Sequence, residues 1–195
     1  MRKEAVDLLK AWIAISLAFA IATTGFGFSY KFAIAVAIAA FTVGIGFLGH
    51  ELAHKFVAQK FGCWAEFRSF DQMLLIAIVM SFFGFVFAAP GGVFIRGRQS
   101  LRHNGIISAS GPATNIVVSL LFLGIAMIVP SWLVLAKTVA SYGFFINSWL
   151  AAFNMLPFFN FDGRKVLAWN KLVYFVLLGA AVALALSQGF LIAGG

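Results

Sequence analysis

The sequence has few charged residues: Asp, Glu, Lys and Arg make up 10% of its 195 residues, against about 25% in an ordinary soluble domain. It also has only 6 acidic residues and 1 cysteine. The single cysteine, Cys63, excludes an intramolecular disulfide bond. Hydrophobic residues reach 63% and the mean hydropathy is +1.01, so a soluble globular domain is excluded. We therefore expect an integral membrane protein whose function depends on very few polar side chains.

The basic residues outnumber the acids by 14 to 6 and give a net charge of +8. They are spread singly between apolar runs rather than gathered into a basic patch, so we expect no nucleic acid partner. Lys and Arg are enriched in the cytoplasmic loops of membrane proteins. Arg2, Lys3 and Lys10 therefore predict a cytoplasmic N-terminus, with the lipid bilayer as the surrounding partner.

The apolar runs predict one membrane-embedded domain over 1–195, an all-α helical bundle with about five transmembrane helices. The predicted crossings are 11–28, 32–48, 105–129, 133–156 and 172–186. The core is expected at 32–165, with the first helix in 1–31, the last in 171–195 and no PDZ domain. An alternative for the first run is a cleaved signal peptide, because Ala18-Phe19-Ala20 resembles a cleavage site.

The segment from Met73 to Ala89 is long enough to span, but Arg96, Arg98 and Arg102 follow it closely. A crossing would leave these arginines outside, so we expect a re-entrant segment that turns back at Pro90-Gly91-Gly92. Phe85–Phe87 and Val93–Ile95 are the expected strands of a short membrane-associated β hairpin. Alternation in Cys63–Phe70 predicts a further short strand.

The strongest motif is His50-Glu51-Leu52-Ala53-His54, or HExxH, in a helix that continues from the second run to about Lys60. Two histidines four positions apart share one helix face and can bind one metal ion, with the glutamate beside them. Ionisable residues in an apolar helix are costly, which favours a functional role. Catalytic zinc usually has three protein ligands.

The third ligand must come from another part of the chain, because Val57 and Lys60 exclude the extended zincin motif. Glu66 and Asp71 are expected to be solvated, and His103 interfacial. Asp162 stands among apolar and amide side chains and is the best candidate. Two crossings separate it from HExxH when 73–89 is re-entrant, so it returns to the same side of the membrane. Glu4, Asp7, Glu66 and Asp71 are interpreted as ordinary interface charge.

These features resemble the site-2 proteases, the intramembrane zinc metallopeptidases of the M50 type. The resemblance covers His50 to Lys165 and rests on four elements: HExxH in the second helix, Gly111-Pro112-Ala113-Thr114-Asn115, Asn154-x-x-Pro157, and Asp162-Gly163. It implies that His50, His54 and Asp162 bind Zn²⁺, that Glu51 is catalytic, and that Asn154 holds substrate or an adjacent strand. It also implies a β element around Gly91-Gly92-Val93. Phe161 and Lys55 depart from the usual family pattern.

The expected function is zinc-dependent hydrolysis of peptide bonds in or near the transmembrane segments of protein substrates, with Glu51 activating a water. The alternatives are a zinc permease and a catalytically silent zinc-binding scaffold. Asn154 could donate to the substrate backbone or to the oxyanion, or could equally form a helix–helix hydrogen bond, and Asn115 is expected to serve packing. An exposed strand edge at Val93–Ile95 could hold an extended substrate. The short loops favour a prokaryotic cell membrane, with the site towards the cytoplasm, and the sequence leaves the oligomeric state open.

Overall fold

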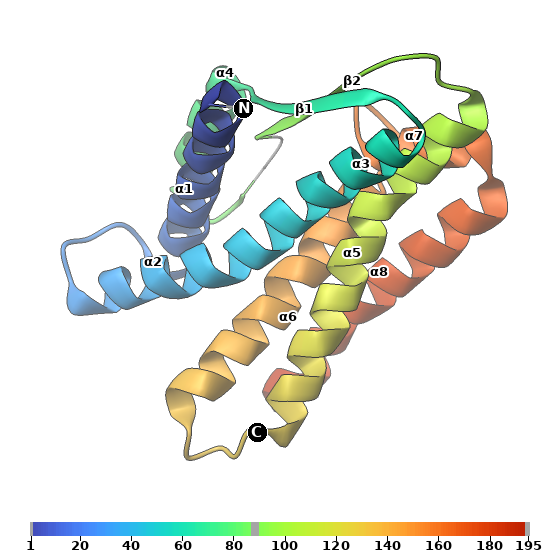
Figure 1. Ribbon diagram of the computed structural model, residues 1–195. Coiled ribbons are helices and arrows are strands. Elements are labelled where there is room, and N and C mark those ends of the chain that lie inside the picture. Colours follow the sequence, from blue (N-terminus) through green and yellow to red (C-terminus); the bar gives the residue numbers. More distant parts are fainter. Residues whose placement is uncertain (1, 87–89, 194–195) are drawn as a thin grey trace.

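The computed structural model describes residues 2–86 and 90–193, which form a helical bundle capped at one end by a small sheet (Figure 1). The helices are α1 (Arg2–Thr24), α2 (Tyr30–Val43), α3 (Gly49–Lys60), α4 (Asp71–Ser81), α5 (Leu101–Ile128), α6 (Val134–Asn154), α7 (Asp162–Trp169) and α8 (Lys171–Ala193). A π-helical stretch, η1 (Gly44–Leu48), joins α2 to α3, and the strands are β1 (Trp64–Ser69) and β2 (Gly91–Arg96).

Three helical segments are long and apolar enough to cross a membrane: Lys3–Thr24, Tyr30–Lys60 and Leu101–Ile128. The predicted continuation of the second run to Lys60 is therefore confirmed. Helix α4 has 11 residues and a length of about 16 Å, roughly half the ~30 Å hydrocarbon core. The described part of the 73–89 segment thus contains no spanning helix. The count of about five transmembrane helices stays a prediction.

The hairpin differs from the predicted one in its pairing. β2 pairs antiparallel with β1, from Trp64 opposite Arg96 to Ser69 opposite Gly91. Phe85 and Val86 belong to no strand, and Phe87 lies outside the described residues. The chain also turns directly after α4, where Gly84 has a φ of +75°, and not at Pro90-Gly91-Gly92. The predicted pairing was wrong because register depends on a partner strand that lies far away in the sequence.

The lack of a side chain at Gly91 explains why this residue can belong to the strand rather than to a turn. A Cβ at this position would meet the carbonyl oxygen of Arg68 and the ring of Phe67 on the facing strand. The absence of a side chain lets β2 begin close against β1.

A Schellman motif ends α3 and directs the chain into β1. Gly62 has a φ of +73°, its N–H donates to the carbonyl of Gln59 at 2.9 Å, and the N–H of Cys63 donates to that of Ala58 at 3.1 Å. These bonds satisfy the last carbonyls of the helix. The hairpin is therefore attached directly to the helix that carries HExxH.

Helix α1 is attached to the rest of the domain by partly buried ion pairs. Glu4 accepts two hydrogen bonds from Lys55 Nζ, at 2.7 and 2.8 Å, and one from the backbone N–H of Phe67 at 3.1 Å. Arg68 contacts Asp7 at 3.3 Å and Glu66 at 2.7 Å. The interpretation of Glu4 and Asp7 as ordinary interface charge was wrong, because both residues are buried.

The same contacts bear on the signal-peptide alternative. Cleavage after the first run would remove the partner of Lys55 and one of the two carboxylates that pair with Arg68, and it would uncover the core surface on which α1 buries Ala11 and Ile15. The charge-assisted hydrogen bonds of Glu4 would be lost with it. The contacts favour an α1 that stays in the folded protein.

The hydrogen bonds of Glu4 to Lys55 and Phe67 lead to a prediction about stability. Glu4→Ala removes three charge-assisted hydrogen bonds and leaves the Phe67 N–H without its acceptor. We expect the free energy of unfolding in detergent to fall by about 1–3 kcal/mol. Asp71→Asn is the matched control, because the Lys10–Asp71 pair also joins α1 to the hairpin end of the molecule but is exposed. An equal effect of both substitutions on thermal unfolding would contradict the prediction.

Candidate metal centre

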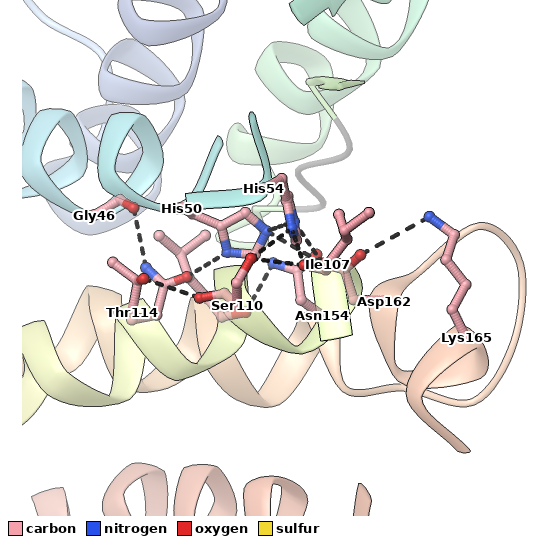
Figure 2. A network of polar contacts seen from close by, with 11 residues as sticks. Gly46, His50, His54, Ile107, Ser110, Thr114, Asn154, Asp162 and Lys165 are labelled. Atoms are coloured by element: carbon pink, nitrogen blue, oxygen red, sulfur yellow. Dashed lines mark hydrogen bonds and ion pairs between the residues drawn. The ribbon is translucent and has the colours of Figure 1, made fainter. Parts of the chain in front are cut away.

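HExxH lies on α3 as predicted and places both histidines on the face that contacts α5. His50 Nε2 and His54 Nε2 are 2.9 Å apart. Asp162, the first residue of α7, brings its Oδ2 to 3.2 Å from His50 Nε2 and 3.0 Å from His54 Nε2. All three residues are buried. The structure thus unites the three predicted ligands in one cluster, although 108 residues separate His54 from Asp162 in the sequence (Figure 2).

The donor geometry fits a zinc ion. Ligand atoms at 2.0–2.1 Å from a tetrahedral zinc lie roughly 3.3 Å from one another, close to the three distances above. One atom from each of His50, His54 and Asp162 lies within 4.8 Å of the others, and the group could hold a metal ion. Two imidazoles and one carboxylate are a donor set typical of catalytic zinc, which keeps a fourth position open.

The second nitrogen of each imidazole is held by α5. His50 Nδ1 lies 2.6 Å from Asn115 Oδ1, and His54 Nδ1 lies 2.7 Å from the carbonyl oxygen of Ile107. A carbonyl oxygen can only accept, so His54 carries its proton on Nδ1. This tautomer directs the lone pair of His54 Nε2 into the cluster, as metal binding requires.

A chain of amides determines the same tautomer for His50. Asn147 Nδ2 donates to the Gly143 carbonyl at 2.8 Å, so its Oδ1 is free to accept from Asn115 Nδ2 at 3.1 Å. Asn115 Nδ2 also donates to the Gly46 carbonyl at 3.1 Å. Asn115 Oδ1 must therefore accept the proton of His50 Nδ1.

The π-helical stretch before α3 supplies part of this arrangement. Gly46 lies in it, and a Cβ there would collide with Asn147 Oδ1. π-helical turns are rare and are often found at functional sites. Here the turn joins α2 to the helix that carries the metal ligands, within one helical segment from Tyr30 to Lys60.

Gly111 lets the backbone of α5 approach both imidazole rings. A Cβ at this position would lie 2.5 Å from His50 Nε2 and 2.6 Å from His54 Cε1. No side chain atom fits there without displacing a ring. The close approach also allows α5 to reach both Nδ1 atoms.

Glu51 is buried beside the cluster and lines the same cavity as His50, His54 and Asp162. Its Oε2 is fully buried and has no hydrogen-bond partner among the described residues. Native proteins seldom leave a buried carboxylate oxygen unpaired, and such an atom calls for an explanation.

The cavity in front of the cluster has a volume of about 850 Å³. β2 and α4 border it on one side, and the loop before Asp162 borders it on another. Phe159 in this loop has a φ of +49°, and its carbonyl accepts a hydrogen bond from Arg164 at 3.2 Å. The loop that leads into Asp162 therefore contains a residue, Phe159, in a backbone conformation that non-glycine residues seldom adopt.

The other polar residues that the sequence singled out lie outside the metal cluster. Glu66 pairs with Arg68, Asp71 with Lys10, and His103 stacks on Phe61 at 4.2 Å, so none of the three joins the metal group. Asn154 lines the cavity, but its Nδ2 donates to the Leu150 carbonyl of its own helix at 2.9 Å. Its proposed contact with substrate stays a prediction.

Asn115, which was expected to serve packing, and Asn147, which no sequence motif singles out, have a more specific role. Both are fully buried and orient His50. An amide within an apolar helix is itself a signal of a specific partner, but neither residue shows in the sequence which partner it has.

The chain is similar to a protein of Methanocaldococcus jannaschii named "Putative zinc metalloprotease". The two are 40% identical over 138 residues, which cover 70% of this chain and 72% of that protein. The chain belongs to this zinc metalloprotease family. The His-His-Asp group is the part of this family member that could hold the zinc. No protein-family model matches the chain, and no solved structure does.

Gly111 provides a test of the metal centre. We expect Gly111→Ala to lower zinc content strongly, because the added methyl group displaces the histidine rings by a few tenths of an ångström or more. Gly124→Ala on the same helix is the control, since a Cβ there meets nothing within 4 Å. Zinc per chain, measured by atomic emission after purification, should stay at the wild-type value in the control. Full zinc content in Gly111→Ala would contradict the described contact.

Proposed function

We propose that this member of the zinc metalloprotease family is an intramembrane endopeptidase of the site-2 protease type. It would hydrolyse peptide bonds in or near transmembrane segments of membrane proteins. The observation that carries the proposal is the buried Glu51 carboxylate beside the His-His-Asp group. Its Oε2 has no hydrogen-bond partner among the described residues, and it lines a cavity within a bundle of apolar helices.

His50, His54 and Asp162 would hold the Zn²⁺, which supplies a Lewis acid that activates water and polarises a carbonyl. Glu51 accepts one proton from the attacking water, whose oxygen bonds to the scissile carbonyl carbon. When the tetrahedral intermediate collapses, the C–N bond breaks and Glu51 passes the proton to the leaving nitrogen. The first products are a carboxylic acid and an amine, and transfer of the remaining water proton from the acid to the amine gives a carboxylate and an ammonium group. Burial of Glu51 keeps competing water away from this proton.

The distribution of basic residues supports a cytoplasmic location of the site. All Lys and Arg residues except Lys31 and Lys137 belong to a few segments: the first half of α1, α3, the two strands, the loop after β2, the first turn of α5, α7 and the start of α8. Figure 1 shows these segments at the end of the bundle that carries β1 and β2. Under the positive-inside rule this end faces the cytoplasm. We propose a multi-pass protein of a prokaryotic cell membrane.

An extended substrate could add to the free edge of β2. Residues 91–95 of β2 line the cavity, whereas none of the described β1 residues does. Phe70 N–H donates to the Pro90 carbonyl at 2.9 Å. Because successive N–H groups of an antiparallel strand point alternately to the partner strand and away from it, this bond determines which β2 residues bond to β1. With the observed register, Phe94 directs its N–H to β1, and Val93 and Ile95 direct theirs to the free edge.

The role of Glu51 can be tested with a reconstituted transmembrane peptide. We expect Glu51→Gln to lower the rate of peptide cleavage by a factor of about 100 or more. Zinc content should stay normal because the metal ligands are intact. Product is measured by mass spectrometry, and zinc per chain by atomic emission. Equal amounts of product from wild type and Glu51→Gln would refute the proposed function.

A proline scan of β2 tests strand addition. Ile95→Pro removes an N–H from the free edge and leaves the ladder intact, so cleavage should fall at least ~10-fold with normal zinc content and thermal stability. Phe94→Pro is the matched control for damage to the hairpin, since it removes a ladder hydrogen bond and should lower stability. Full cleavage by Ile95→Pro would exclude substrate pairing with β2.

A further inference from the structure

The proposed reaction places a negative charge on the former carbonyl oxygen of the substrate. Donors directed at such an oxyanion are usually a large part of the catalytic effect. Asn154, the residue predicted for this task, donates through Nδ2 to the Leu150 carbonyl. The amide protons of Asn115 are also engaged, with Gly46 and Asn147.

Lys165 is the one Lys or Arg among the described residues that line the cavity. Its Nζ lies 3.9 Å from Asp162 Oδ1, which is beyond hydrogen-bond distance. In the described parts of the chain this ammonium makes no hydrogen bond, and its side chain is 41% exposed. All three of its N–H groups are therefore available to a ligand.

The position of Lys165 follows from the first turn of α7. Asp162 and Lys165 are three residues apart and lie next to each other on one face of the helix. Asp162 directs Oδ2 to the histidines and Oδ1 towards Lys165. Figure 2 shows the ammonium on the far side of Asp162 from His50 and His54. A flexible cation thus stands at the edge of the metal cluster, within the cavity that would receive the peptide.

We propose that Lys165 is a catalytic residue whose ammonium group donates a hydrogen bond to the scissile carbonyl oxygen as this oxygen becomes negative. The inference rests on the proposed function. No proton moves to the oxygen, and Lys165 keeps its charge throughout. When the carbonyl re-forms, the C–N electron pair leaves with the nitrogen, which takes its proton from Glu51.

The first test compares Lys165→Met, Lys165→Arg and the control Lys171→Met. Lys171 is an exposed cation at the start of α8, so its substitution removes the same charge outside the cavity. With a reconstituted transmembrane peptide we expect Lys165→Met to lower kcat about 100-fold, with a KM close to that of wild type. Lys165→Arg should recover part of kcat, and Lys171→Met should match wild type.

The outcomes separate this inference from the proposed function. If wild type fails to cleave, the proposed function is wrong. If wild type cleaves and Lys165→Met has the same kcat, only the assignment of Lys165 is wrong. A fall in kcat that Lys171→Met reproduces would show a general charge effect and overturn the assignment as well.

The second test measures binding instead of turnover. A phosphinic peptide carries a tetrahedral anionic group in place of the scissile amide, and calorimetry gives its affinity directly. Lys165→Met should weaken the binding of this ligand about 100-fold, in line with the loss in kcat. When Lys165→Met is added to Glu51→Gln, which does not cleave the peptide, the affinity for the uncleaved peptide should stay unchanged. Cobalt-substituted protein serves as the control on the metal centre. A changed visible spectrum or lost metal in Lys165→Met would show that Lys165 only positions Asp162, and would overturn the proposal.

Discussion

The close contact between α3 and α5 at Gly111 is the constraint on which the metal centre depends. Because Gly111 has no side chain, the backbone of α5 lies against both imidazole rings, and Asn115 and the Ile107 carbonyl reach the two Nδ1 atoms. Each ring is then fixed in orientation and tautomer. The two Nε2 atoms face each other, and Asp162 reaches them from the first turn of α7. Geometry is thus set by packed helices, which hold positions better than loops do.

The contact needs the polar network behind it, because an amide in an apolar interior is stable only when its hydrogen bonds are satisfied. Asn115 and Asn147 satisfy each other and the carbonyls of Gly46 and Gly143. Ser119 and Ser148 extend the same α5–α6 interface with a 2.8 Å hydrogen bond. The network joins η1, α5 and α6 into one frame. Buried and fully paired polar groups of this kind favour a single arrangement of the helices.

The opposite wall of the cavity is built differently. The hairpin, α1 and α3 are joined by ion pairs of Glu4 and Asp7 with Lys55 and Arg68, at the end of the bundle where the basic residues gather. β2 presents its unpaired edge to the cavity, and α7 presents Lys165. α5 and the amide network therefore hold the two histidines, while the groups proposed to meet the substrate lie on the hairpin and on α7, which also carries Asp162.

Much of this protein was determined by local sequence features. HExxH places two histidines and Glu51 on one turn of a helix because the spacing of four residues matches the helical period, and long apolar runs predict membrane helices. Asp162 could be found by elimination, since so few acids were available. The tertiary structure alone decided the pairing of β2 with β1, the burial of Glu4 and Asp7, the partners of Asn115, and the approach of Lys165 to Asp162. Each of these features depends on contacts between segments that lie far apart in the sequence. Packing sets the relative position, register and rotation of such segments, and the local sequence pattern carries no information about these quantities.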